Sequence, residues 1–368
     1  MRVAIVHDWL VVYSGSERVL EQIINVFPQA DLYSLIEFIP QDQRKFIQEK
    51  RVFTSFIQKL PKAHTQYRAY LPLMPIAIEQ FDFSSYDLVI SCSHAVSKGI
   101  ITSPTQLHIC FHNGYMHYAW DQQNVYLKES GLSKLGGNLT RYFLHYMRIW
   151  DYQASQRPDV NIANSRFMAS ILRKLYKREA HVINPPVDVD LFEVSEKKEP
   201  FYVTVARLVP IKKVGLIVQT FKQLDKELIV IGDGPEMETI KRIAGRKTHL
   251  LGFQPSKVIR QYLQKARAFV FASNEPFGIV TLEAQACGTP VIAYGRGGAL
   301  ETVVADRTGI FFDEQTSQSL ASAVERFEQM QFDPVVIRQN AERFSAERFR
   351  REFKAFVENA WAEFQAKL

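Results

Sequence analysis

The sequence has little of what several large classes of protein require. Only three of its 368 residues are cysteines, Cys92, Cys110 and Cys287, and their spacing fits neither a disulfide framework nor a metal site. No apolar run approaches the roughly 18–20 residues of a membrane-spanning helix, and there is no internal repeat or nucleic-acid-binding motif. These absences argue against a disulfide-rich secreted protein, a transmembrane protein and a repeat array. They predict core thiols in a reducing cytoplasm.

The bulk composition is that of a soluble globular protein, with 46% hydrophobic and 23% charged residues. A chain of 368 residues is too long for one core of ordinary size and therefore predicts two domains. The first seven residues run directly into an apolar strand, so we expect no signal peptide and a cytoplasmic location.

The net charge of +6 is concentrated in residues 41–68, where seven lysines and arginines stand against two acidic residues. Four aromatic residues, Phe46, Phe53, Phe56 and Tyr67, lie among these charges. Basic residues among aromatics suit an anionic membrane surface or a nucleic acid, and a solvated helical face is an equally ordinary interpretation. Because no nucleic-acid motif accompanies the segment, we expect no nucleic-acid partner and a peripheral contact with the inner face of the plasma membrane.

Short apolar runs alternate with helical stretches along the whole chain, which predicts α/β domains with parallel sheets. The expected strands are 2–7, 31–35, 87–91, 107–111, 160–163 and 180–183 in the first half, and 201–205, 227–231, 249–251, 268–271 and 291–294 in the second. Between the halves, Pro185-Pro186 and a charged, irregular stretch mark a linker. The predicted domains are 1–186 and 187–345, followed by a helix over 346–368.

The linker contains Asp188-Val-Asp190, which has the spacing of a divalent-ion site on a diphosphate. It stands behind two prolines and away from any phosphate-binding turn. We therefore expect no metal at these residues.

The stretch from Asn274 to Gly298 carries the densest set of signals in the chain. Pro276 and Gly278 end the strand before it, and residues 279–287 have the apolar spacing of a helix. The first turn of that helix has free backbone N–H groups, where an anion can bind. Glu275 stands before this turn and Glu283 one turn inside the helix.

Carboxylates beside an anion site are suited to hydroxyl groups rather than to phosphate. A ligand with hydroxyls at both ends and phosphates between them is a nucleotide sugar. The alternative is an ordinary strand–helix crossover, in which one glutamate is a cap and the other is solvated. The joint occurrence of Glu-x7-Glu, Pro-Phe-Gly and Gly-Thr-Pro favours the ligand site.

With these motifs the sequence resembles the retaining glycosyltransferases of the GT4 family, which have the GT-B fold. The resemblance implies two Rossmann-like domains facing a cleft, with the acceptor on the first and the nucleotide-sugar donor on the second. It also implies that the terminal helix crosses back to the first domain. The implied reaction transfers a hexose with retention of configuration and requires neither a metal nor another cofactor.

The resemblance assigns a role to individual residues of this sequence. Arg207 and Lys212 match the family's Arg-x4-Lys donor-phosphate motif, and these two cations at a β–α turn would also neutralise a diphosphate on physical grounds. Glu275 would bind the donor sugar and Glu283 the ribose. The remaining donor contacts are expected at Gly15, Ser16, Gly252, Phe253, Gln254, Pro276, Phe277, Gly278, Ile279 and Val280.

The turn around Gly15 and Ser16 offers backbone and hydroxyl donors near a helix N-terminus, but it lacks the three-glycine dinucleotide fingerprint. In GT4 enzymes the corresponding loop is usually Gly-Gly and approaches the donor phosphates and the acceptor. Here a serine takes the place of one glycine.

The segment from His112 to Asp121 resembles the Cys-His-Thr-Pro-x-Arg-Tyr-x-Trp-Asp block of bacterial mannosyltransferases that build O-antigens and related polysaccharides. On that pattern His112 takes the place of the active-site histidine and would contact the sugar and the incoming hydroxyl. Asn113-Gly114 and His117 depart from the pattern. The expected catalytic set is His112, Glu275, Arg207 and Lys212.

The resulting hypothesis is a mannosyltransferase that uses GDP-mannose, is metal-independent and acts on a lipid-linked or polysaccharide acceptor. Three alternatives stay open at this point. They are a transferase that uses a UDP-sugar, an epimerase or hydrolase on the same scaffold, and a non-catalytic sugar- or membrane-binding protein.

Overall fold

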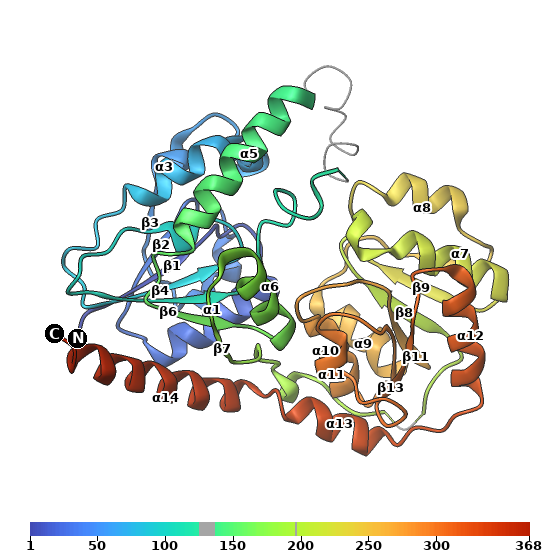
Figure 1. The fold of residues 1–368 in the computed structure, drawn as a ribbon. Helices are drawn as coiled ribbons and strands as arrows, with labels where there is room; N and C mark the ends of the chain where they lie inside the picture. Colours follow the sequence, from blue (N-terminus) through green and yellow to red (C-terminus); the bar gives the residue numbers. More distant parts are fainter. Residues whose placement is uncertain (125–136, 196) are drawn as a thin grey trace. The chain divides into compact units, whose positions relative to one another are not determined.

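The computed structural model of the protein describes residues 1–124, 137–195 and 197–368. The chain forms two compact units, Met1–Asn184 together with Phe349–Leu368, and Pro185–Arg348 (Figure 1). The sequence placed these two divisions after residue 186 and after residue 345. Each unit is a parallel sheet with helices on both faces, so the predicted pair of Rossmann-like α/β domains is confirmed.

The sheet of the first unit has seven parallel strands in the order β3-β2-β1-β4-β5-β6-β7. The strands are β1 Val3–His7, β2 Asp31–Ser34, β3 Val52–Thr54, β4 Leu88–Ser93, β5 Leu107–His112, β6 Val160–Ala163 and β7 His181–Val182. Every residue of β1, β4 and β5 is buried, as expected of central parallel strands that are covered on both faces. The chain passes outward from β1 through β2 to β3 and then returns to β4, so the strand order reverses between β1 and β4.

Helices cover both faces of this sheet. They are α1 Gly15–Val26, α2 Ala63–Gln66, α3 Met74–Glu79, α5 Gly137–Ala154, α6 Arg166–Tyr176 and α14 Ala346–Gln365, with 3-10 turns η1 Gln41–Ile47, η2 Phe56–Lys59, η3 Tyr67–Leu73 and η4 Ser97–Gly99. The core on one face packs α1 and α14, and the core on the other face packs α3 and α5.

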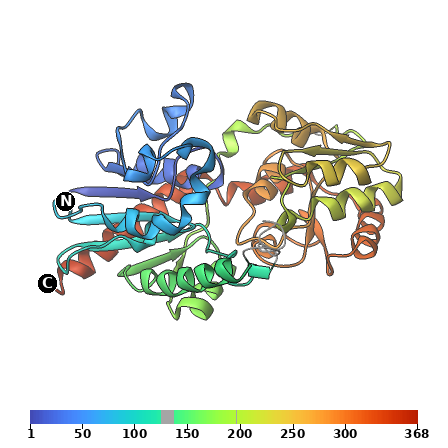
Figure 2. The ribbon, with the colours of Figure 1, turned by 90° about the horizontal axis from the view of Figure 1, so that it is seen from above.

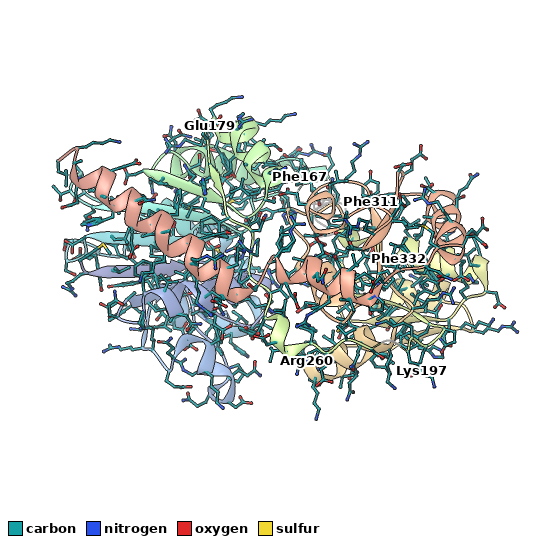
Figure 3. All side chains as sticks on the ribbon, turned by 90° about the horizontal axis from the view of Figure 1, so that it is seen from below. Phe167, Glu179, Lys197, Arg260, Phe311 and Phe332 are labelled. Carbon is teal, nitrogen blue, oxygen red and sulfur yellow. The ribbon has the colours of Figure 1, made fainter. Side chains whose placement is uncertain are left out.

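The terminal helix α14 lies across the first unit's sheet, as predicted (Figure 3). Phe349, Phe353 and Val357 on one side of this helix are fully buried. The ring of Phe349 lies 5.9 Å from that of Phe111 in β5. Burial of three such side chains contributes roughly 1.5–3 kcal/mol each, which is enough to hold the helix in place.

The second unit repeats the architecture with six parallel strands in the order β10-β9-β8-β11-β12-β13. The strands are β8 Tyr202–Val205, β9 Leu228–Ile231, β10 Thr248–Leu250, β11 Ala268–Phe271, β12 Val291–Tyr294 and β13 Gly309–Phe312. The helices and turns are η5 Val189–Leu191, η6 Pro210–Lys212, α7 Val214–Leu224, α8 Met237–Ile243, α9 Ser256–Lys265, α10 Ile279–Ala286, α11 Ala299–Thr302, α12 Ser317–Glu328 and α13 Pro334–Glu342. One face packs α9, α10 and α13, and the other α7, α8 and α12 (Figures 1 and 2).

All the predicted strands are present, and two edge strands were missed. Strand β3 has three half-buried residues inside the basic segment, and β13 has one short apolar run. Strand β3 was missed because its residues are only half-buried and lie among charged neighbours, whereas β13 is mostly buried and has the same length as the central strands β11 and β12.

Two further sequence predictions concern burial, and a third concerns membrane-spanning helices. The three cysteines are free and buried, as expected of core thiols. In the basic segment, Phe46 and Tyr67 are 6% exposed and packed in the core, whereas Phe56 is 37% exposed. The aromatic side chains of this segment therefore do not form one exposed surface for a membrane. In the part of the chain that the structure describes, no helix has the length and apolarity needed to cross a membrane.

Candidate active site

The second unit places its predicted site residues on two loops at the carboxyl edge of its sheet. Its strand order reverses between β8 and β11, and ligands of open α/β sheets bind at such a reversal. Arg207 and Lys212 lie in the loop after β8, and Glu275 lies in the loop after β11. The two loops touch, because the Ser273 hydroxyl donates a hydrogen bond to the carbonyl of Ile211 at 3.3 Å.

Lys212 and Glu275 form an ion pair across these loops, with Nζ in contact with Oε2. The lysine side chain is 26% exposed and the glutamate side chain 19%. The other carboxylate oxygen, Oε1 of Glu275, is buried and has no hydrogen-bond partner among the described residues. An unpaired buried acceptor costs about 1–3 kcal/mol, and an O–H donor placed there would remove that cost.

The helix α10 begins directly after this loop and points its N-terminus at the same edge. Gly278, its N-cap residue, has φ = 84°, and a Cβ at this position would lie 2.9 Å from the ring of Phe271. Only glycine combines the left-handed backbone with that close approach. No side chain within residues 1–124, 137–195 and 197–368 caps the helix, so the N–H groups of its first turn and its partial positive charge are suited to an anion.

A third loop, after β12, contacts the backbone at Glu275. The Gly298 N–H donates to the Glu275 carbonyl at 2.8 Å. A Cβ on Gly297, which has φ = 65°, would lie 2.6 Å from the Glu275 carbonyl oxygen, and one on Gly298 would lie 2.2 Å from Cα of Phe277. The sequence showed a glycine-rich loop here, but the contact that makes the glycines necessary is tertiary.

The other residues predicted to bind the donor lie around this edge. Glu283 is 5% exposed and sits inside α10. Gly252 has φ = 67° with open space where a Cβ would be, and Phe253 is 75% exposed. The Gln254 amide donates to the carbonyl of Leu251 at 2.7 Å. These residues follow β10, and the Gly252 carbonyl accepts a hydrogen bond from the Gly232 N–H after β9 at 2.8 Å.

In the first unit, the predicted turn at Gly15 and Ser16 opens α1. The Ser16 hydroxyl donates to Glu17 Oε1 at 3.0 Å, and the Ser14 hydroxyl donates to Glu17 Oε2 at 2.7 Å. Glu17 Oε1 also lies 3.0 Å from His7 Nε2. Burial by itself would raise the pKa of Glu17, but the hydrogen bonds from His7 and Ser14 and the His7 charge lower it to about 2. Because the Ser16 hydroxyl is engaged with Glu17, a contribution to an anion site would come from its backbone N–H.

His112 is placed differently from what the sequence suggested. It is the last residue of β5, is 1% exposed, and its Nε2 lies 2.8 Å from Oδ1 of Asn161 in β6. Burial lowers the pKa of the His112 ring to about 4, which keeps it neutral. A ring in this position contacts a sugar only if the residues that cover it move, because the last side chain of a buried strand is itself part of the core.

Sequence reasoning missed a histidine and an aspartate that meet at the strand reversal of the first unit. Asp8 follows β1, is completely buried, and accepts four backbone N–H groups. His94 and Ala95 donate to its Oδ2 at 2.7 and 3.0 Å, and Val96 and Ser97 donate to its Oδ1 at 2.7 and 2.6 Å. His94 Nδ1 lies 2.9 Å from Asp8 Oδ2. The available signals were that Asp8 directly follows the predicted strand 2–7 and that His94 lies three residues after the predicted strand 87–91.

Comparison with known proteins adds a family match within the second unit. Residues 190–344 match the family described as "Glycosyl transferases group 1". A GDP-mannose-dependent alpha-(1-6)-phosphatidylinositol monomannoside mannosyltransferase of Mycolicibacterium smegmatis is 34% identical over 143 residues, which are 34% of this chain and 37% of that protein. A D-inositol 3-phosphate glycosyltransferase of Mycobacteroides abscessus is 26% identical over 202 residues, 48% of this chain and 46% of that protein. The chain thus spans less than half the length of each of these two relatives.

Solved structures resemble the chain over nearly its whole length. Sucrose-phosphate synthase from Thermosynechococcus elongatus has a TM-score of 0.72 at 18% identity, covering 99% of this chain and 100% of that one. Anabaena HepE in complex with UDP and glucose has a TM-score of 0.70 at 18% identity, covering 97% and 99%. At such identities the likeness establishes the fold, which is GT-B. The chain therefore has a GT-B fold and matches the glycosyl transferases group 1 family over residues 190–344, so the resemblance to GT4-type glycosyltransferases predicted from its sequence is confirmed.

Proposed function

We propose that this protein is a metal-independent, retaining glycosyltransferase that transfers a hexose from a nucleotide sugar to a lipid-linked or polysaccharide acceptor. The observation that carries this proposal is the Lys212–Glu275 pair beside the uncapped N-terminus of α10. Among the described residues, it combines an ammonium group, a carboxylate oxygen without a hydrogen-bond partner and a set of backbone N–H groups at one edge of the sheet. A sugar diphosphate has the matching groups, hydroxyls and phosphates side by side.

In the proposed complex, Arg207, Lys212 and the N–H groups at Gly278 and Ile279 bind the diphosphate. Negative charge grows on the leaving phosphate as the bond to the sugar breaks, so these donors stabilise the transition state more than the bound donor. One such donor typically accounts for about 3–4 kcal/mol. Glu275 Oε1 accepts a hydrogen bond from a hydroxyl of the donor sugar, and Glu283 accepts one from the ribose.

The transfer itself exchanges one bond for another. The bond from the anomeric carbon to the phosphate oxygen breaks, and a bond to the acceptor oxygen forms on the same face of the sugar. The proton of the acceptor hydroxyl passes to the departing phosphate oxygen, and a nucleoside diphosphate leaves. This route needs no carboxylate base, so a buried, neutral His112 is compatible with it.

We propose mannose from GDP-mannose as the transferred group. The mycobacterial relative named as a GDP-mannose-dependent mannosyltransferase supports this choice. A UDP-sugar donor is the alternative, and the HepE structure solved with UDP and glucose supports it. The exposed Phe253 beside the open Gly252 offers a flat contact for a nucleobase of either kind.

We also propose that the first unit contacts an anionic membrane surface, through α5 rather than through residues 41–68. Five large side chains on the outer side of α5 are exposed, Leu139, Tyr142, Tyr146, Ile149 and Tyr152. Arg141 and His145 are exposed among them, and the single acidic residue of this helix, Asp151, is buried. An apolar and aromatic face with only positive charge suits anionic headgroups, which is where a lipid-linked acceptor would lie.

A panel of nucleotide sugars tests the proposal. Thermal unfolding is measured with GDP and UDP, with GDP-mannose and with UDP-sugars, and a selective donor at about 100 times its Kd raises the unfolding free energy by about 2.7 kcal/mol. The selected donor is then incubated alone and with an acceptor glycan. Rapid turnover of the donor alone would identify a hydrolase or epimerase instead. The proposal fails if no nucleotide sugar stabilises the protein, or if stabilisation is unchanged when Lys212 and Glu275 are both replaced.

A further inference from the structure

A second polar cluster lies at the carboxyl edge of the first unit's sheet and is not part of the proposed donor site. It surrounds the strand reversal between β1 and β4, the position at which an open parallel sheet binds ligands. Asp8 and Trp9 follow β1, and His94 follows β4. The three side chains come from two loops that are 86 residues apart in the chain.

Hydrogen bonds hold the Asp8 side chain of this cluster in one orientation. Both of its oxygens are saturated by the four N–H groups of the loop after β4, and the side chain is fully buried. Burial by itself would raise the pKa of Asp8, but the charge and the hydrogen bonding of His94 hold the pKa well below its usual range. The carboxylate therefore stays ionised and cannot rotate without breaking several hydrogen bonds.

His94 is held on three sides. Its Nδ1 lies 2.9 Å from Asp8 Oδ2, and its ring meets the ring of Trp9 edge-on at 4.5 Å and that of His7 at 6.0 Å. The side chain is nevertheless 27% exposed. Nδ1 is the ring nitrogen that is buried, which leaves Nε2 for a ligand.

Several charged groups set the protonation of this histidine. Burial by itself would lower the pKa of His94, but Asp8 and, more weakly, Glu17 raise it above its usual value, with Lys98 acting in the opposite direction. An imidazolium whose Nδ1 lies 2.9 Å from Asp8 Oδ2 still has Nε2–H as a hydrogen-bond donor. The Nε2 atom of His7 lies 3.0 Å from Glu17 Oε1, and the His7 side chain is completely buried.

Trp9 supplies the apolar part of the cluster. Its ring is partly buried, lies 5.4 Å from the ring of Tyr67 in a tilted arrangement and meets the ring of His94 edge-on at 4.5 Å. A rigid aromatic ring beside a hydrogen-bond donor matches a hexose, which has an apolar C–H face and a rim of oxygen atoms. Because His94 and Asp8 neutralise each other, the cluster favours an uncharged sugar over a phosphate.

We propose that Trp9 and His94 form a binding subsite for an uncharged hexose unit of the acceptor, with Asp8 as the positioning residue of His94. The Trp9 ring contacts the C–H face of the sugar, and His94 Nε2–H donates to one of its oxygens. His94 takes no proton during the transfer, since that proton leaves with the phosphate. The assignment of the sugar as acceptor rests on the proposed function, but sugar binding itself can be measured without it.

The test uses the full chain and three probes, methyl α-mannoside, methyl α-glucoside and methyl α-galactoside, with binding followed by ligand-observed NMR. Wild type binds at least one probe, and W9L and H94Q each bind it about 10–100-fold more weakly. H249Q is the matched control, since His249 also pairs with a carboxylate, Glu227 at 3.4 Å, but lies in the second unit. The stabilisation by GDP or UDP stays at the wild-type level in every variant.

Two further readouts separate a binding role from a structural one. With a saturating donor, H94Q raises the KM for the acceptor about 10–100-fold and changes kcat less than threefold. In wild type the acceptor KM rises as the pH passes above the pKa of His94, and D8N moves that rise to lower pH, whereas H94Q removes it.

Undiminished probe binding by W9L and H94Q would overturn the subsite, as would failure of wild type to bind any of the three probes. If wild type binds a probe through Trp9 and His94 but transfers no sugar from any nucleotide sugar, the subsite stands and the proposed transferase function fails.

Discussion

Replacement of Lys212 by methionine should reduce the rate of transfer strongly while changing the unfolding free energy of the protein only a little. Methionine keeps most of the length of the apolar stem but removes the ammonium group that contacts Glu275 Oε2. In the absence of donor, the substitution removes an ion pair whose lysine side chain is 26% exposed. Exposed ion pairs contribute about 0–1 kcal/mol to the unfolding free energy. We therefore expect K212M to unfold within about 1 kcal/mol of wild type.

The effect on transfer is expected to be much larger. The ammonium group contacts the diphosphate while charge builds on the leaving oxygen, and loss of one such donor typically raises the barrier by about 3–4 kcal/mol. Since each 1.36 kcal/mol is a factor of ten, kcat should fall by roughly 10²–10³-fold. The assay is release of nucleoside diphosphate at saturating donor and acceptor, beside a thermal melt of the same preparation.

The matched control is K226M. Lys226 pairs with Glu328 at 3.2 Å in the same unit, and the two side chains are 31% and 25% exposed, close to the values for Lys212 and Glu275. Glu328 keeps its contact with Arg267 at 3.0 Å when Lys226 is replaced, so the stability loss of K226M should be no larger than that of K212M, and its kcat should match wild type. Equal activity of K212M and wild type, or equal losses of activity in K212M and K226M, would refute the reasoning.

Three more predictions follow from the geometry. G298A should destabilise the second unit by about 1–3 kcal/mol in a thermal melt, because its Cβ would lie 2.2 Å from Cα of Phe277, and G215A, whose nearest neighbour is at 3.7 Å, should not. The pKa of Glu17 falls from 4.5 to about 2 on folding, so its contribution of about 3 kcal/mol is present above pH 4.5 and is lost as the pH falls towards 2. In urea titrations between pH 5 and pH 3, E17Q should lose less stability than wild type. Replacement of Tyr142 and Tyr146 together by serine should abolish flotation with phosphatidylglycerol vesicles.

Each of these three has its own contrary result. A G298A protein as stable as wild type would mean that the third loop does not constrain Glu275. If E17Q and wild type lose the same unfolding free energy between pH 5 and pH 3, Glu17 does not contribute to the acid sensitivity of the fold. The matched surface variant for α5 is L300S, since Leu300 is 54% exposed in the second unit. Equal flotation of the double serine variant and L300S would show that α5 is not the membrane contact. If wild type dimerises with rising concentration and the double variant does not, α5 binds a second copy of the chain instead.

The local architecture of this protein was readable from its sequence. The run before Asn274, the break at Pro276 and Gly278 and the helix that follows predicted a strand–turn–helix unit, and β11 and α10 lie within a residue or two of that prediction. The terminal helix was readable in the same way, because Phe353, Phe356, Trp361 and Phe364 have helix-like spacing, and all four pack on the core of the first unit. Periodicity encodes which side of an element is buried, so elements and their buried sides follow from sequence.

Side-chain partnerships were decided by the tertiary structure alone. Lys212 meets Glu275, and Asp8 meets the loop at His94, because the strand order places β8 beside β11 and β1 beside β4. His112 directly follows the apolar run of a predicted strand, as Asp8 does, yet its ring is packed against Asn161. Sequence spacing fixes the position of a residue along its own strand. Which neighbouring strand its side chain faces, and whether a loop covers it, depends on contacts between segments far apart in the chain.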